Sequence, residues 1–288
     1  MKKLAIVGVF YDGYYDLWED FLELFFKNWP DCPYPLFIVD SEKDIQFDKS
    51  YNVSVVKAGK NAEYSKKIQT ALTTLPFDYY LLLLEDFFIS KPVNTKLIEE
   101  VIKIIIEKGI DYYVMPCPEF NNLQFSRFHS DKEYLFVKKF DKRIEYTVSC
   151  QPAVWSKEFL SECIGTENYN AWIFEGMYAK SKTAHSDEFI NKLRMDNRNI
   201  LNIRHGAVQG KILPSVYRDL SREGYSFKSK RDILNKRKYF MHRIKQCAKT
   251  IMPLWVQKSI KKKGILRNSV TGKYVDEIQM MMKKMNLE

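Results

Sequence analysis

The sequence has no apolar run that approaches the roughly 20 residues needed by a membrane-spanning helix. Its apolar start, residues 4–10, is short, and Asp12 and Asp16 follow it without a small-residue cleavage site, so a core strand is a better interpretation than a signal peptide. The five cysteines are scattered, odd in number and without metal-ligand spacing, which favours buried thiols in a reducing cytosol over a disulfide framework or a zinc site. We therefore expect a cytoplasmic protein.

Acidic residues are scarce in the last quarter of the chain. Residues 211–288 hold 20 Lys and Arg against 6 Asp and Glu, a net charge of +14, whereas residues 1–210 hold 26 against 30, a net charge of −4. With 45% apolar and 15% aromatic residues, the chain can bury a sizeable core. The sequence therefore predicts a mildly acidic folded body with a strongly basic tail.

Strand-like and helix-like stretches alternate through the first half of the chain. The hydrophobic patterns predict strands over 4–10, 35–40, 53–57, 79–84 and 111–115, and helices over 16–29, 63–75 and 95–108. This alternation is typical of an α/β fold, an open, mostly parallel sheet with helices on both faces, in which ligands bind beyond the carboxyl ends of the strands. In residues 116–175 the strand and helix patterns are shorter and aromatic residues are frequent, with runs of alternating apolar and polar residues such as 134–140. We expect them to form a smaller antiparallel part that covers the site.

Two adjacent carboxylates, Glu85 and Asp86, follow six apolar or aromatic residues that predict a strand buried on both faces. Burying carboxylates there is costly unless a cation binds them. A hard divalent ion that bridges them to a diphosphate is therefore the first interpretation. The alternative is a solvated turn after a core strand, which the apolar residues Phe87, Phe88 and Ile89 make less favourable.

Several short motifs occur in an order and spacing that resembles bacterial glycosyltransferases of the GT-A fold, which assemble surface polysaccharides such as capsule, O-antigen and lipooligosaccharide. The motifs are Tyr64-Ser65-x-Lys67 at a helix start, residues 78–88 with the acidic pair, Gln151-Pro152-Ala153-Val154-Trp155 followed by Leu160, Asn170-Ala171-Trp172-Ile173-Phe174-Glu175, His205-Gly206 and Gly210-Lys211. The resemblance covers residues 4–214 or so. It implies a GT-A-like catalytic domain over 1–214 and leaves a basic, helical C-terminal segment over 215–288.

By this resemblance, Glu85 and Asp86 stand where GT-A enzymes keep a metal-binding Asp-x-Asp motif. Only the final Asp matches, so Asp86 is the firmer ligand for Mn²⁺ or Mg²⁺, and Glu85 is expected to contact the ribose or metal-bound water of the donor site. In many of these enzymes a histidine near the end of the catalytic domain completes the set of metal ligands, and His205 follows the other motifs in the order expected for it. A hydrogen-bonded loop histidine is the alternative.

Other residues suit the nucleotide-diphosphate donor. Asp40 ends the second predicted strand and suits a hydrogen bond to the base or ribose, unless it only forms a turn with Ser41. Tyr11, just past the first strand, suits stacking on the base, whereas Lys67 and Lys211 suit the phosphates as compact positive charges. The alternative for Tyr11 is an ordinary aromatic residue on the surface. The alternative for Lys67 is a solvated lysine on a helix.

Glu175 is the candidate catalytic base of an inverting transfer, in which a carboxylate removes the proton of the attacking acceptor hydroxyl. Partial burial beside Trp172 and Phe174 would raise its pKa toward neutrality, and the resemblance places an acid near the start of a helix under the acceptor. A glutamate that faces water is the alternative. Gln151, Trp155 and Trp172 suit an acceptor pocket, since a sugar face packs on tryptophan and its hydroxyls pair with amides.

Residues 228–267 hold 14 Lys and Arg and one acid, Asp232, with interleaved aromatic and aliphatic side chains. Such a segment suits binding to an anionic membrane surface, where each basic residue contributes about 1 kcal/mol to the binding free energy. The resemblance implies a lipid-linked acceptor, and an enzyme with that acceptor would need to bind the membrane. Nucleic-acid binding is the rival, but the acidic body and the lack of a recognised motif argue against it. Packing onto the catalytic domain, or within a homodimer, is a further alternative.

We therefore expect a metal-assisted, inverting glycosyltransferase that uses a nucleotide-sugar donor, with a UDP-sugar favoured, at the inner face of the cell membrane. Its acceptor would be a glycan or a lipid-linked glycan. A nucleotidyltransferase shares this sheet and metal chemistry but usually carries a Gly-rich basic loop after the first strand, and residues 9–13 contain one Gly and no Lys or Arg. A non-catalytic membrane or nucleic-acid binder would depend on the tail alone.

Overall fold

The computed structural model describes residues 3–42, 48, 50–118, 129–130, 137–140, 147–196, 198–237, 239–241, 244 and 271–287. Part of the predicted membrane-binding segment, residues 245–267, lies outside the described residues, as do residues 134–136 of the alternating run. None of the helices within these ranges is long and apolar enough to cross a membrane.

One sheet organises the fold, and within the described ranges it contains nine strands in the order β3-β2-β1-β4-β9-β6-β10-β8-β7. Its parallel half consists of β1 (Leu4–Val9), β2 (Leu36–Asp40), β3 (Val53–Lys57) and β4 (Tyr79–Leu83), in the positions that the sequence predicts. Its other half mixes directions in β6 (Tyr112–Val114), β7 (His129–Ser130), β8 (Lys138–Lys139), β9 (Ala153–Ser156) and β10 (Leu193–Met195).

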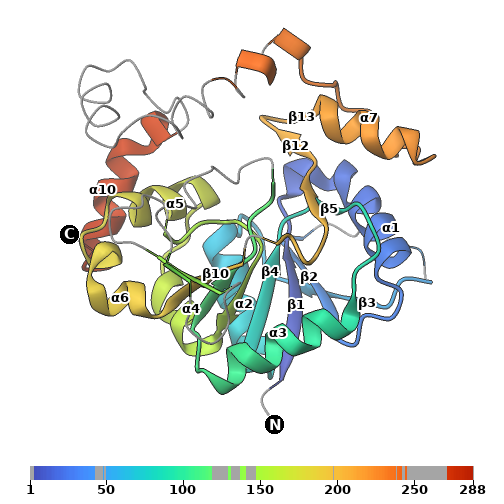
Figure 1. Cartoon of the computed structure of the whole chain (residues 1–288). Helices are drawn as coiled ribbons and strands as arrows, with labels where there is room; N and C mark the ends of the chain where they lie inside the picture. Colours follow the sequence, from blue (N-terminus) through green and yellow to red (C-terminus); the bar gives the residue numbers. More distant parts are fainter. Residues whose placement is uncertain are drawn as a thin grey trace.

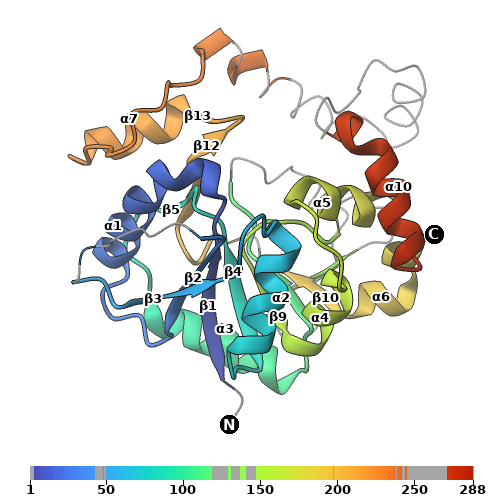
Figure 2. The ribbon, with the colours of Figure 1, turned by 180° about the vertical axis from the view of Figure 1, so that it is seen from behind.

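Helices cover both faces of the sheet because the central strands are apolar on both sides (Figures 1 and 2). On one face, Ile6 and Leu81 pack in a core with α1 (Trp18–Asn28) and α3 (Thr95–Glu107). On the other, Val7 and Leu82 pack in a core with α2 (Tyr64–Thr74), α4 (Lys157–Ile164) and α5 (Ala171–Lys180). The predicted α/β fold, an open and mostly parallel sheet flanked by helices, is confirmed.

The antiparallel strand β9 lies in the middle of the sheet, between β4 and β6, rather than over a site. Its Trp155 pairs with Tyr80 and Tyr112 on the two neighbouring strands, and its ring packs edge-on against Tyr112 at 4.4 Å. The expectation that residues 116–175 as a whole cover the site is therefore wrong for this part. An apolar strand flanked by two other strands gains more from burial in the core than from covering a polar cleft.

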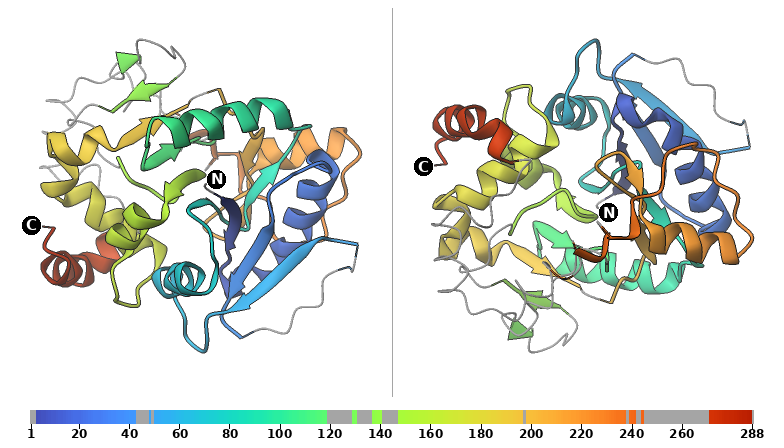
Figure 3. Two further views of the ribbon diagram at one scale, coloured as in Figure 1. Left: turned by 90° about the horizontal axis from the view of Figure 1, so that it is seen from below. Right: turned by 90° about the horizontal axis from the view of Figure 1, so that it is seen from above.

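The carboxyl ends of β1, β2 and β4 meet at one edge of the sheet because these strands are parallel. Short elements follow at this edge: η1 (Asp12–Leu17) after β1, and β5 (Phe87–Ile89), which pairs antiparallel with β11 (Ile203–His205), after β4. A hairpin of β12 (Ala207–Val208) and β13 (Lys211–Ile212) comes directly after β11. The view from above in Figure 3 shows this hairpin and η1 on the same side of the molecule.

The chain beyond residue 214 packs on both cores. Helix α7 (Pro214–Arg222) contributes Val216 and Leu220 to the core of α1 and α3. Helix α10 (Val275–Lys284), preceded by η4 (Thr271–Tyr274), packs Ile278 against Gly176 of α5, where an added Cβ would lie 2.4 Å from its Cδ1. The remaining short elements, η3 (Thr183–His185) and α6 (Asp187–Asn191), connect α5 to β10. The basic segment therefore packs on the predicted catalytic domain at both of its described ends.

Candidate active site

The acidic pair Glu85 and Asp86 lies in the turn between β4 and β5, at the carboxyl edge of the sheet. Both residues are buried, with 4% and 6% of their surface exposed. Burial raises the pKa of both carboxyl groups, and the neighbouring Asp86 raises that of Glu85 further. Their ionised forms are therefore destabilised in the protein alone, so the pair favours a bound cation.

Asp86 and His205 are brought together by the pairing of β5 with β11, in which His205 stands opposite Phe87. The imidazole Nδ1 lies 3.5 Å from Oδ2 of Asp86, and the backbone N–H of Gly206 donates to the Asp86 carbonyl at 2.6 Å. The other carboxylate oxygen, Oδ1, is buried and has no hydrogen-bond partner within the described part of the chain. The two predicted metal ligands thus share one corner, and no described residue gives the buried Oδ1 of Asp86 a hydrogen bond.

This corner suits a metal ion that is held jointly by protein and substrate. Within the described ranges, no three side chains of His, Cys, Asp or Glu are gathered as a ready metal site. Mg²⁺ and similar hard ions are commonly held by one or two carboxylates, with water and substrate phosphate oxygens as the remaining ligands. The buried Oδ1 of Asp86 and the adjacent imidazole fit that arrangement.

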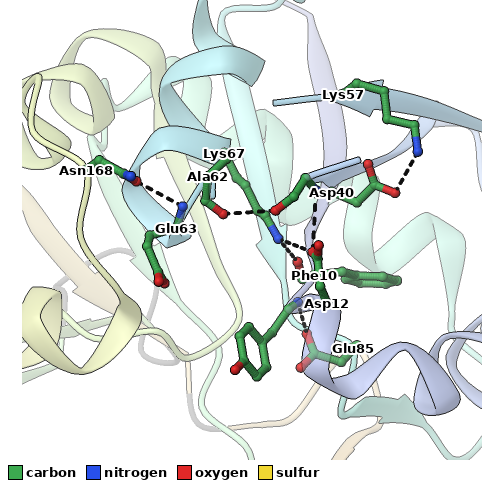
Figure 4. A network of polar contacts seen from close by, with 11 residues as sticks. Phe10, Asp12, Asp40, Lys57, Ala62, Glu63, Lys67, Glu85 and Asn168 are labelled. Atoms are coloured by element: carbon green, nitrogen blue, oxygen red, sulfur yellow. Dashed lines mark hydrogen bonds and ion pairs between the residues drawn. The ribbon is translucent and has the colours of Figure 1, made fainter. Parts of the chain in front are cut away.

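Lys67 is buried at the carboxyl end of β1 rather than solvated (Figure 4). Its Nζ donates to the Phe10 carbonyl at 2.5 Å and to Oδ1 of Asp12 at 2.7 Å, and the same Asp12 oxygen accepts from the backbone N–H of Ser41. The positive charge also lowers the pKa of Glu85. Lys67 therefore ties the ends of β1 and β2 together beside the acidic pair.

Asp40 ends β2 at the same edge (Figure 4), and Tyr11 follows β1 there. Asp40 is buried, with Oδ2 paired to Nζ of Lys57 at 3.1 Å, and its Oδ1 has no hydrogen-bond partner among the described residues. Burial raises the pKa of this carboxyl. The backbone N–H of Tyr11 donates to Oε2 of Glu85 at 3.1 Å, whereas the Tyr11 side chain is 59% exposed. A buried acceptor and an exposed ring at this edge are compatible with binding a nucleoside.

Glu175 lies in the first half of α5, which Asn170 caps by accepting from the backbone N–H groups of Trp172 and Ile173. Its Oε1 accepts from the backbone N–H of Cys150 at 2.8 Å, and burial raises its pKa. The pKa of the Cys150 thiol is raised by burial and then by the charges of both Glu175 and Asp86. The two carboxylates therefore both raise the pKa of one common neighbour.

Of the three residues predicted to contact the acceptor, Trp172 and Gln151 are at least partly exposed and Trp155 is not. Trp172 is 45% exposed at the start of α5, and Gln151 accepts from the backbone N–H of Cys117 through Oε1 at 3.0 Å. Trp155 is 1% exposed in the sheet core, against Phe159 and Phe174. A sugar cannot pack on a buried ring, so the assignment of Trp155 to the acceptor pocket is corrected to a core role.

Lys211 is engaged away from the acidic pair. Its Nζ pairs with Asp232 at 2.9 Å, and its side chain is 46% exposed. Arg231, next to that acid, instead acts electrostatically on both Asp86 and Glu85. Sequence analysis missed Arg231 because one arginine in a long basic run carries no local signal. Asp16 holds Arg231, and Asp20 accepts from the backbone of Lys228 and Ser229 just before it. Both acids were visible as carboxylates spaced four residues apart in an apolar helical stretch.

Comparisons with known proteins give no family assignment. No family model matches the chain, and no curated protein matches it in sequence. Residues 1–349 of TarS from S. aureus align in structure with a TM-score of 0.45 at 15% identity, over 69% of this chain and 58% of that chain.

Two further solved structures are similar at the same level. Glucosyl-3-phosphoglycerate synthase from Mycobacterium tuberculosis, in complex with Mn²⁺, UDP-glucose and phosphoglyceric acid, gives a TM-score of 0.46 at 10% identity, over 86% of this chain and 80% of that chain. A cytidylyltransferase from Leptospira borgpetersenii gives 0.45 at 12% identity, over 93% and 98%. Similarities at this level give no residue-by-residue correspondence between those active sites and this chain.

Proposed function

We propose that the protein transfers a sugar from a nucleotide-diphosphate donor to a hydroxyl group of a glycan or lipid-linked acceptor. The observation that carries this proposal is the corner formed by Asp86 and His205 at the carboxyl end of a central strand, where a buried carboxylate oxygen has no hydrogen-bond partner among the described residues. In open α/β sheets this edge is the usual place for a ligand. A diphosphate with a divalent ion supplies the positive charge and the oxygen ligands that the corner needs.

The donor would lie across the ends of β1, β2 and β4. Asp86 and His205 would hold Mn²⁺ or Mg²⁺, which when bound stabilises negative charge on the departing diphosphate. Asp40 would accept a hydrogen bond from the base or ribose, and Tyr11 would cover the base. Lys67, already bonded to Asp12, would contribute mainly by fixing the strand ends and by its field on Glu85. A UDP-sugar is the favoured donor.

Glu175 would act on the acceptor side as the general base of an inverting transfer. Its raised pKa supports this role, because a base that titrates closer to neutrality accepts the hydroxyl proton more readily. The exposed Trp172 at the same helix start would pack on a sugar face, and Gln151 would pair with acceptor hydroxyls. The acceptor hydroxyl would lose its proton to Glu175 as its oxygen attacks the anomeric carbon, and the nucleoside diphosphate would leave.

The basic segment would hold the enzyme at the inner, cytoplasmic face of an anionic membrane, where a lipid-linked acceptor is found. Among its described residues, Phe240, Met241 and Ile244 are 65%, 47% and 44% exposed, next to the basic Lys236 and Arg237. Exposed apolar groups among positive charges suit the interface of an anionic bilayer. A homodimer contact is the alternative for the same surface, and no nucleic-acid partner is expected.

The experiment that tests the function measures nucleotide binding and then product release. Calorimetry with UDP, GDP, CDP and ADP, with and without Mn²⁺, should give one nucleoside diphosphate whose binding needs the metal. Turnover of the matching nucleotide-sugar should then release a nucleoside diphosphate. Release of pyrophosphate from a nucleoside triphosphate and a sugar phosphate would instead identify a nucleotidyltransferase. Absence of metal-dependent binding for all four nucleotides would refute the proposal.

A further inference from the structure

A strap formed by residues 225–231 is fastened to the helix that follows the first strand. Asp20 of α1 is fully buried and accepts three hydrogen bonds from the strap: from the Tyr225 hydroxyl at 2.7 Å and from the backbone N–H groups of Lys228 and Ser229 at 2.7 and 3.0 Å. A buried carboxylate with three donors fixes its partners firmly, because each unmade bond would leave charge without solvent. The strap is therefore part of the folded body.

Arg231, at the end of the strap, is held by an ion pair and two carbonyl groups. Its Nε and Nη2 donate to the two carboxylate oxygens of Asp16 at 2.7 and 2.6 Å, an arrangement in which Ser229 also donates to Asp16. Its Nη2 donates to the Gly13 carbonyl at 2.9 Å, and its Nη1 to the Gly210 carbonyl at 3.2 Å. The side chain is 15% exposed, so the guanidinium is fixed but not sealed off.

The two loops that Arg231 joins are the loops that contact the acidic pair. The loop after β1 donates the Tyr11 N–H to Glu85 and two residues later presents the Gly13 carbonyl to Arg231. The loop after β11 donates the Gly206 N–H to the Asp86 carbonyl, and after its hairpin turn presents the Gly210 carbonyl. Gly210 has φ +78°, a conformation that favours glycine and that closes this turn toward the guanidinium.

The ring of Tyr14 completes the surroundings of the guanidinium. The Arg231 Cζ lies 4.0 Å from the centre of this ring, which orients the guanidinium plane. Tyr14 belongs to the same loop whose Gly13 carbonyl accepts from Arg231 and whose Tyr11 N–H donates to Glu85.

We propose that Arg231 is the anion-binding residue of the donor site, and that the strap holds it over the acidic pair to receive the diphosphate. The proposal rests on the proposed function for the identity of the anion, and it replaces Lys211 as the phosphate-binding cation. One N–H of Nη1 remains without a described partner, and the two loops whose carbonyls hold the guanidinium also contact Glu85 and Asp86. Arginine suits this task because its planar donor group binds phosphate in a fixed orientation.

The test compares the two partners of one ion pair, using full-length wild type, R231Q and D16N. The probes are inorganic pyrophosphate, UDP and Mn²⁺ alone, measured by calorimetry. R231Q should bind pyrophosphate and UDP in the presence of Mn²⁺ roughly 10- to 100-fold more weakly, because it loses a hydrogen bond to a charged group. It should bind Mn²⁺ alone as well as wild type or better, since it loses a positive charge that would repel the cation.

D16N keeps the guanidinium but removes its competing carboxylate, so D16N should bind pyrophosphate at least as tightly as wild type. R222Q, at an exposed arginine of α7, is the matched control and should leave all three affinities unchanged. A purely structural ion pair would make R231Q and D16N lose every ligand, Mn²⁺ included, to the same degree, and that result would overturn the proposal. R231Q with wild-type pyrophosphate affinity would overturn it too. If R231Q does not fold, a loss of pyrophosphate affinity in D16N alone decides against it.

The two proposals fail separately in this experiment. If the wild type binds pyrophosphate and this binding depends on Arg231, but it binds no nucleoside diphosphate, the anion site is supported and the proposed function is refuted. Wild type that binds UDP with Mn²⁺ while R231Q binds it equally well keeps the function and removes Arg231 from the donor site.

Discussion

The imidazole Nδ1 of His205 lies 3.5 Å from Oδ2 of Asp86 because β11 returns from a distant part of the chain to pair with β5. The ladder of Ile203, Arg204 and His205 against Ile89, Phe88 and Phe87 fixes that distance through the backbone. A shift of one residue in this pairing would turn His205 to the opposite face. The position of the two predicted metal ligands is thus set by strand register.

The first prediction concerns the metal corner. Asp86→Asn should keep the shape and remove the charge that burial destabilises, so the melting temperature in chelator should not fall. The gain in nucleoside-diphosphate affinity caused by Mn²⁺ should drop at least about tenfold, or ~1.4 kcal/mol. Calorimetry with and without Mn²⁺ measures this gain. Asp78→Asn is the matched control, because Asp78 accepts from the Lys3 N–H at the opposite end of the same strand. Equal losses in both variants would argue against a metal at Asp86.

The second prediction concerns Glu175. Glu175→Gln should lower turnover roughly 10²- to 10⁴-fold, the usual contribution of a positioned base, with donor affinity unchanged. The control is Glu162→Gln, an exposed glutamate of α4 paired to Lys192, which should keep wild-type turnover. Products with retained anomeric configuration would remove Glu175 from this role, because a retaining transfer needs no such base.

The pH dependence of Glu175 is a separate prediction. Its pKa is raised by burial, and the base must be ionised to act, so turnover should fall as the pH drops through a value above that of an ordinary glutamate. Because the folded-state pKa is the higher one, this group stabilises the fold below its unfolded pKa and loses that contribution as the pH rises through its folded pKa. Glu175→Gln should therefore be no less stable than wild type at pH 8. If turnover of the variant falls at low pH in the same way as that of the wild type, the fall is caused by the titration of another group.

The fourth prediction concerns the strap. Tyr225→Phe removes one of three donors from the buried Asp20 and should lower the free energy of unfolding by about 1–3 kcal/mol. Tyr217→Phe is the control, since that ring is 39% exposed and stacks on Phe227, and it should change stability by less than about 0.5 kcal/mol. Urea denaturation measures both. Equal midpoints in the two variants would show that the strap is not fastened through Asp20.

The fifth prediction concerns the membrane. Replacing Phe240, Met241 and Ile244 together by serine should leave folding intact, because all three are exposed, and should markedly reduce co-sedimentation with vesicles that contain an anionic lipid. The matched control replaces the exposed Val275 and Met280 of α10 by serine and should sediment like wild type. If the wild type does not sediment with the vesicles but binds duplex DNA at moderate salt, this result would support the nucleic-acid alternative instead.

Local sequence was sufficient for the parallel half of the sheet. The strands over Leu4–Val9, Leu36–Asp40, Val53–Lys57 and Tyr79–Leu83 are short apolar or alternating runs bounded by turns and charges, and each lies where its pattern predicts. The position of Asp40 and Glu85 at one edge followed from parallel direction alone. The sequence also predicted Asp86 and His205 as partners, through the order of motifs rather than through any local pattern.

The middle of the chain could not be assigned by pattern, because Trp155 suits a sugar pocket and a core equally well. Pairing of β9 between β4 and β6 decided in favour of the core. Residue Lys67 likewise looked like a solvated helix lysine or a phosphate ligand, and only the convergence of Phe10 and Asp12 on its Nζ shows that it is buried in a network.

Composition and strand pattern determined that this chain forms an α/β sheet with acids at one edge, because short apolar runs bounded by turns and charges are local features of the sequence. Tertiary structure decided which charges meet that edge. Asp16 and Arg231 are a close ion pair only because residues 225–231 return over α1, and nothing local to either residue encodes that contact. Electrostatic partners are set by distance in space, and distance in space is set by how the whole chain packs.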